Sequence, residues 1–138
     1  GQADGEAIEY DVLGNIISKG NYIEGNKEGE WIYIIGDQKH IGKYVMNEKD
    51  GTWKSYYLTE DILSYDGRYI QGNPDGRHKY FYPSSSLKEE KYYNDGMKVK
   101  SWSRYTENGD LIIVVQYKDG KEYKINGEKV LLKDNQEN

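Results

Sequence analysis

The sequence predicts an all-β protein in which tandem β-hairpins share one antiparallel sheet. The first observation is a tyrosine followed nine residues later by an aromatic ring, a pair that recurs about every 24 residues. The second is a turn-forming segment inside each pair, and the third is a composition rich in tyrosine but poor in other core residues. The pairs are Tyr22 and Trp31, Tyr44 and Trp53, Tyr69 and His78, and Tyr93 and Trp102, with a degraded fifth copy at Tyr117.

Glycines accompany these rings at fixed offsets. They stand two residues before the tyrosine at Gly20, Gly42 and Gly67, and two residues before the second ring at Gly29, Gly51 and Gly76. The fourth copy carries Lys91 and Lys100 at these two positions. A glycine here has two explanations: a ring of the adjacent strand lies over the bare backbone, or a positive φ closes the turn. The sequence leaves both explanations open.

Segments rich in Gly, Asn and Asp separate the two rings of each pair. They are "GNKEG" at 25–29, "NEKDG" at 47–51, "GNPDG" at 72–76 and "NDGMK" at 94–98. Such residues tolerate tight turns, so each unit is predicted to be a β-hairpin. Pairing Tyr22 with either Trp31 or Tyr33 keeps all three rings on one side. We therefore expect one aromatic face and one mixed, more polar face.

The composition suits a single domain built as a thin sheet. The chain has 138 residues with 15 Tyr and three Trp, but only one Phe and two Met. Tyr and Trp bury a ring while keeping a polar group at the water boundary, which favours a half-exposed sheet. We expect residues 1–8 to be disordered or extended, residues 9–133 to form about five repeats, and residues 134–138 to be a disordered tail. The apolar run "LIIVV" at 111–115 is expected to be covered on both faces, with residues 128–133 as the cover.

Charge and residue content narrow the classes of function. The formal net charge of -5 argues against binding nucleic acid, which needs a concentrated basic face. The chain has no cysteine, so disulfides and thiolate metal sites are excluded. Its longest apolar run, at 111–115, is far shorter than a membrane-spanning helix. Because the sequence begins without Met, we expect an exported protein of the periplasm or cell surface, with a cytoplasmic location as the alternative.

The sequence predicts no catalytic residue, cofactor site or metal site. His78 occupies a ring position of the repeat, where it replaces Trp, and His40 lies in a different unit. A nucleophile, a base and an orienting group cannot be assembled from local spacing. Most carboxylates fall in turns, where they cap amides or face water, and no stretch has the spacing of a calcium loop.

The aromatic stripe is the strongest candidate both for a core and for a binding surface. We expect Trp31, Trp53 and Trp102 to form the core, because rings at repeat positions pack across neighbouring hairpins. Flat rings also bind sugars or peptides at small entropic cost. The tyrosines expected to be partly exposed, and therefore to contact a ligand, are Tyr56, Tyr57, Tyr80, Tyr82 and Tyr92.

Three stretches, "GNYIEGNKEGEWIYI", "GKYVMNEKDGTWKSYY" and "GRYIQGNPDGRHKYFY", resemble the MORN-repeat variant of bacterial proteins, some described as exported proteins of 24-residue repeats. The resemblance covers residues 9–126. It implies an elongated, twisted and largely single-layer antiparallel sheet. The departures are His78 in place of Trp and the loss of glycines or rings in the fourth and fifth copies.

These features favour a non-catalytic repeat scaffold that mediates protein–protein or cell-surface interaction. The first alternative is a cell-wall or glycan-binding module that uses the Tyr and Trp stripe, because the repeat is also similar, more weakly, to choline-binding wall modules. The second alternative is an antitoxin-like protein that binds a partner, since bacterial members of the resembled family often carry that label. The sequence leaves the oligomeric state open.

Overall fold

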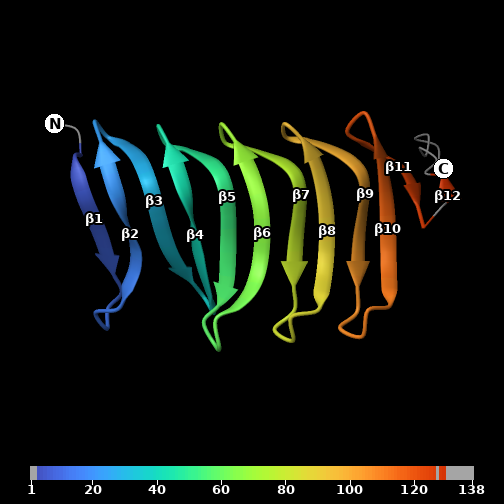
Figure 1. The fold of residues 1–138 in the computed structure, drawn as a ribbon, viewed down its shortest axis with the longest axis horizontal. Helices are drawn as coiled ribbons and strands as arrows, with labels where there is room; N and C mark the ends of the chain where they lie inside the picture. The colour runs from blue at the N-terminus through green and yellow to red at the C-terminus, as the bar shows by residue number, and fades with distance from the viewer. Residues whose placement is uncertain (1–2, 127, 130–138) are drawn as a thin grey trace, which may run out of the picture.

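The computed structural model describes residues 3–126 and 128–129, which form one sheet of twelve strands (Figure 1). The strands are β1 (Gly5–Tyr10), β2 (Ile16–Ile23), β3 (Asn26–Ile35), β4 (Gln38–Val45), β5 (Glu48–Tyr57), β6 (Ile62–Ile70), β7 (Asn73–Phe81), β8 (Leu87–Asn94), β9 (Met97–Tyr105), β10 (Leu111–Lys118), β11 (Lys121–Ile125) and β12 (Glu128–Lys129). Their order across the sheet is their order in the sequence.

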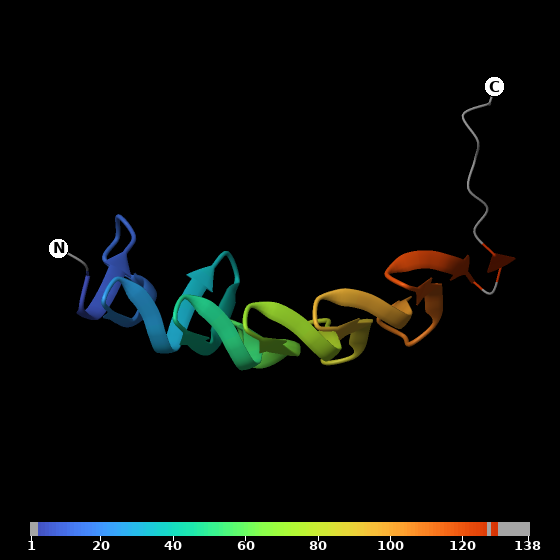
Figure 2. The ribbon, with the colours of Figure 1, turned by 90° about the horizontal axis from the view of Figure 1, so that it is seen from above.

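Each strand pairs antiparallel with the strands before and after it in the chain. The sheet is open, with β1 at one edge and the C-terminal strands at the other, so it does not close into a barrel (Figure 1). Seen from above, the hairpins follow one another along the long axis in a single layer, and the strands curl (Figure 2). The predicted all-β class, the tandem hairpins and the elongated single-layer sheet are therefore confirmed.

In the first three units the tight turn lies at or before the start of the predicted segment, whereas in the fourth unit it lies within the predicted segment 94–98. Each turn consists of two residues that both have a positive φ, the geometry of a type I′ hairpin turn. The turns are Glu24 and Gly25, Met46 and Asn47, Gln71 and Gly72, Asp95 and Gly96, and Asp119 and Gly120. Most of each of the first three predicted turn segments therefore belongs to the following strand.

Both predicted pairings of Tyr22 are wrong, because the hairpin contains a bulge. Tyr22 pairs with Lys27 near the turn. Further along, Lys19 pairs with Ile32 and Asn21 with Glu28, so three residues of β3 lie opposite the single residue Gly20. The corresponding hairpins repeat this irregularity opposite Gly42, Gly67 and Lys91. The extra residues bend the strand and change which side chains share a face.

The bulge explains both sets of glycines. The first set provides bare backbone under a ring, as one explanation had it, whereas the second set has the positive φ of the other explanation but adopts it in the bulge rather than in the turn. A Cβ added at Gly20 or Gly42 would lie closer than 3.0 Å to the ring of Trp31 or Trp53. These glycines therefore provide a bare backbone on which a ring lies. Gly51 instead has a φ of +77° within the bulge, a conformation that costs other residues free energy.

At its N-terminal end the sheet begins inside the segment 1–8, which was expected to be disordered or extended. Strand β1 begins at Gly5 and pairs with β2, so part of the 1–8 segment is extended. The tail at 134–138 and part of the expected cover at 128–133 lie outside the described residues. Leu111 and Ile112 are 53% and 51% exposed, so among the described residues the start of the "LIIVV" strand is uncovered.

Candidate functional site

The candidate site is one face of the sheet, on which aromatic rings of successive units contact one another edge to face. Tyr22 meets Trp31 at 5.1 Å between ring centroids, and Tyr44 contacts both Trp31 at 6.1 Å and Trp53 at 5.2 Å. The contacts continue in the later units through Tyr69, His78, Tyr93, Trp102 and Tyr117. This row of rings is the core of a sheet that has no second layer.

A hydrogen bond from each ring fixes its position in the bulge. The indole Nε1–H of Trp31 donates to the carbonyl of Asn21 at 3.1 Å, and that of Trp53 donates to the carbonyl of Lys43 at 3.1 Å. In both units the acceptor is ten residues before the ring. The bond satisfies a backbone carbonyl beside the bulge, where the regular pairing of the hairpin is interrupted.

His78 makes the same hydrogen bond although it is not a tryptophan. Its Nε2 lies 2.9 Å from the carbonyl of Arg68, ten residues earlier, and the side chain is 1% exposed. Because a carbonyl only accepts, Nε2 carries the proton, and in the neutral ring Nδ1 accepts from the Tyr65 hydroxyl at 2.6 Å. Burial lowers the pKa of His78, which favours this neutral form.

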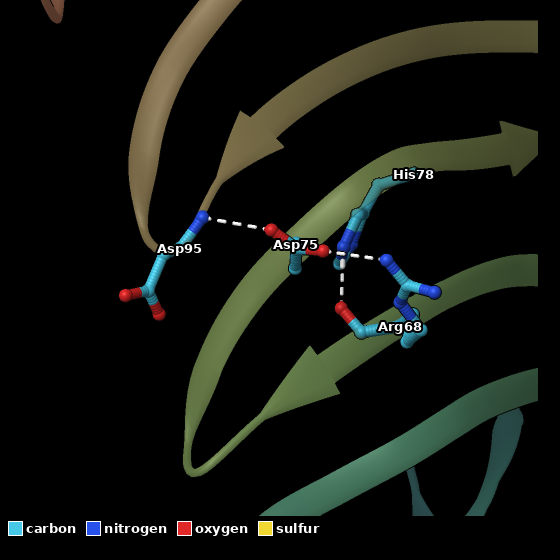
Figure 3. A network of polar contacts seen from close by, with 4 residues as sticks. All are labelled: Arg68, Asp75, His78 and Asp95. Atoms are coloured by element: carbon cyan, nitrogen blue, oxygen red, sulfur yellow. Dashed lines mark hydrogen bonds and ion pairs between the residues drawn. The ribbon is translucent and has the colours of Figure 1, made fainter.

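An ion pair and a backbone contact join the third unit to the turn of the next (Figure 3). Asp75 accepts hydrogen bonds from the Arg68 guanidinium at 2.6 Å and from the backbone N–H of Asp95 at 2.8 Å. The backbone bond from Asp95 is the largest cause that lowers the pKa of Asp75, and the bond from Arg68 comes next. His78 lies beside this network, with its ring directed at the Arg68 carbonyl (Figure 3). These contacts support the ring position rather than form a reactive centre.

Lysine ammonium groups lie over the aromatic rings on this face of the sheet. The Lys27 ammonium lies 5.2 Å from the centroid of Trp31 and donates to the Tyr33 hydroxyl at 2.8 Å. Lys49 lies 4.6 Å from the centroid of Trp53 and 5.0 Å from that of Tyr69. Glycine backbone and lysine ammonium thus both cover these tryptophans. Such cation–π contacts contribute about 0.5–2 kcal/mol each, depending on desolvation.

A groove of about 680 Å³ opens on this face between β3 and β8. Tyr57, Tyr80, Lys49 and His40 are half-buried in its lining, and Ser55 is buried beneath it. A groove of this volume is within the range of ligand-binding pockets. Its walls are rigid, because their rings are held by the contacts described above.

The groove contains one pair of groups with catalytic potential. The Nδ1 atom of His40 lies 2.6 Å from the Ser55 hydroxyl oxygen. Burial, followed by the charge of Lys49, lowers the pKa of His40. Within the described part of the chain, no carboxylate hydrogen-bonds to His40 to orient it. The pair therefore has a nucleophile and a base without the third group of a triad.

Two of the five tyrosines that were expected to contact a ligand line the groove, and three do not. All five are half-buried. Tyr57 and Tyr80 line the groove. Tyr56, Tyr82 and Tyr92 are not among the residues that line it: Tyr56 lies under Lys39, Tyr82 donates to the Tyr105 carbonyl and Tyr92 lies under Lys100.

Sequence reasoning missed the lysines, His40 and Ser55 as residues of the groove. Two of the groove lysines had a detectable signal, because Lys27 and Lys49 each stand four residues before a tryptophan. His40 and Ser55 had none, since their proximity depends on the pairing of β4 with β5.

Among residues 3–126 and 128–129, no three His, Asp or Glu side chains gather in a way that could hold a metal ion. In the same residues, no helix is long and apolar enough to span a bilayer.

The sequential hairpins and the recurring ring position define a β-hairpin repeat protein. A family model described as MORN repeat variant matches residues 74–95, which span nearly all of β7 and β8. The ring position and its hydrogen bond recur in the units before and after this match. Over residues 74–95 this match confirms the resemblance seen in the sequence. No relative was found among curated proteins.

Proposed function

We propose that this protein is a non-catalytic scaffold that binds another protein along the groove face of its sheet. The observation that carries the proposal is the groove of about 680 Å³, whose half-buried Tyr57 and Tyr80 are held in place by the surrounding sheet. Tyr57 is fixed by a hydrogen bond to the Phe81 carbonyl at 2.7 Å, and Tyr80 packs on Tyr65 at 4.9 Å. Preorganised aromatic walls favour association because little side-chain entropy is lost on binding.

The family match supports the scaffold proposal, because MORN repeats are typically binding modules. The geometry of the His40 and Ser55 pair also favours a non-catalytic role. A serine nucleophile needs an oriented base and donors for the developing oxyanion. The described groove supplies the base alone, so we propose no reaction at this pair.

The glycan alternative has weaker support than a protein partner. A sugar binds an aromatic platform by lying on an open ring face, but Trp31 and Trp53 are only 2% and 3% exposed. Their rings are covered by glycine backbone and by lysine. An antitoxin-like role is one form of the protein-binding proposal and has no separate observation in its favour.

Site-specific photo-cross-linking tests the proposal. A benzophenone amino acid is introduced at Tyr57 in the groove and, as a matched control, at Tyr92 outside it, in cells that make the protein. We expect a discrete protein adduct from position 57 and a much weaker one from position 92, identified by mass spectrometry. Glycan adducts at position 57 would favour the glycan alternative, and equal labelling at both positions would contradict binding in the groove.

A further inference from the structure

The groove lies where one unit lacks a tyrosine that its neighbours carry. The position two residues after the buried ring is Tyr33 in the unit before and Tyr80 in the unit after, but Ser55 in the unit between them. All three residues line the groove. The groove therefore has a tyrosine at this position in the unit before and in the unit after, and a serine in the unit between them.

Ser55 lies between two rings of the neighbouring strands. Its cross-strand partners are His40 on β4 and Tyr65 on β6, and Tyr65 is also the partner of Tyr80. The Nδ1 atom of His40 lies 2.6 Å from the Ser55 hydroxyl oxygen, and Ser55 itself is only 4% exposed. An added ring would therefore lie over the buried Ser55, between aromatic walls of the groove.

The charge of the groove contrasts with that of the whole chain. Lys27, Lys49 and Lys88 line it, and among the described residues none of them forms an ion pair with a carboxylate. The one lining carboxylate, Glu89, is already paired with Arg104 at 2.7 Å. A chain with a formal charge of -5 therefore presents a locally positive groove. Such a surface is complementary to an acidic partner.

We propose that the gap at Ser55 receives an aromatic side chain of a partner protein, carried on an acidic segment whose carboxylates approach the groove lysines. The inserted ring takes the place of the missing tyrosine between Tyr33 and Tyr80. This inference rests on the proposed function and specifies the chemistry of its partner.

The test uses the variant Ser55→Tyr, which restores the missing ring. Random dodecapeptides displayed on phage are selected on the full chain, and the enriched peptides are synthesised and titrated by calorimetry. We expect sequences with a Tyr, Phe or Trp flanked by Asp or Glu. The Ser55→Tyr variant is expected to bind them at least about tenfold more weakly, because its own ring occupies the gap. The matched control Thr52→Tyr adds the same ring at an exposed residue of β5 that does not line the groove, and should bind normally.

The role of charge is tested separately with Lys49→Met, which keeps the packing on Trp53 but removes the charge. We expect about fivefold weaker binding of the acidic peptides. Thermal unfolding of each variant shows whether it is folded, and Ser55→Phe replaces Ser55→Tyr if the latter is not.

The outcomes separate this inference from the proposed function. Selection of peptides without an aromatic residue, undiminished binding by Ser55→Tyr, or no enrichment at all would overturn the inference. Photo-cross-linking of a protein from position 57 that persists in the Ser55→Tyr variant would sustain the scaffold proposal while the aromatic insertion fails. Loss of both results would remove the proposed function as well.

Discussion

The tryptophan ring of the first two units and that of the fourth unit are covered by different residues. Trp31 and Trp53 lie on bare glycine backbone and are almost completely buried. Trp102 faces Lys91 at the equivalent position and is only half-buried. The ammonium of Lys91 lies 5.2 Å from its ring centroid. A side chain at this position thus leaves the ring more exposed and adds a cation–π contact.

The hydrogen bond of the ring is conserved between these units although the burial is not. Trp102 donates to the Tyr92 carbonyl at 2.9 Å, as closely as Trp53 donates to the Lys43 carbonyl at 3.1 Å. His78 preserves the same bond in the third unit. The comparison shows that the bulge and its carbonyl define the unit, whereas full burial of the ring depends on the glycine opposite the bulge.

The largest expected effect comes from adding a methyl group under a buried ring. In Gly42→Ala the new Cβ would overlap the Trp53 ring, so the free energy of unfolding should fall by about 3 kcal/mol. The reverse change, Lys91→Gly, should alter it by less than about 1 kcal/mol, since the gain in burial of Trp102 is offset by chain entropy and a lost cation–π contact. Urea denaturation measures both. Equal losses in the two variants would show that the glycine is not what distinguishes the units.

A smaller effect is the pH dependence of stability, which His78 can cause because it titrates and the tryptophans cannot because they do not. Burial lowers the pKa of His78 below the ordinary value, so the unfolded chain binds the proton more readily. Stability should therefore be highest above about pH 6.5 and should fall as the pH drops toward the lowered pKa, by at most about 1.4 kcal/mol per pH unit. Urea titrations at several pH values measure this slope.

Two neutral variants assign that slope to a residue. His78→Gln should remove the His78 share of the pH dependence at some overall loss of stability. His40→Gln is the control, because burial also lowers the pKa of His40. A slope unchanged in His78→Gln would mean that His40 or another group carries it. Asp75 acts in a different window, since its lowered pKa affects stability only in acid below about pH 4.

The smallest effect is expected at the position two residues before the ring, which is Gly51 in the second unit and Lys100 in the fourth. Lys100 has a φ of +58°, the left-handed conformation that Gly51 adopts in the second unit with a φ of +77°. Lys100→Gly should stabilise the protein by about 0.5–1 kcal/mol, and Gly51→Ala should destabilise it by about 1 kcal/mol. Thermal unfolding with both variants tests the pair. A destabilised Lys100→Gly would mean that contacts of Lys100, such as the one with Tyr92, outweigh the backbone strain.

The sequence predicted the fold well because its signal is periodic. One period fixes the hairpins, the ring positions and the order of the strands. The turns were misplaced because the pair Met46 and Asn47 contains no glycine, whereas Gly51, taken as a turn residue, lies in a bulge. The groove could not be predicted, because it arises where Ser55 lacks a ring and the gap is visible only against the neighbouring units.

The strict order of the strands has a mechanical consequence. Because each strand pairs only with the strands next to it in the chain, removing the terminal hairpin leaves a sheet whose new edge has the same construction as the old one. Force applied at the two ends should therefore peel the array hairpin by hairpin, in a series of small steps rather than one large rupture. Under such force we expect the sheet to extend progressively and to re-form from the part still folded.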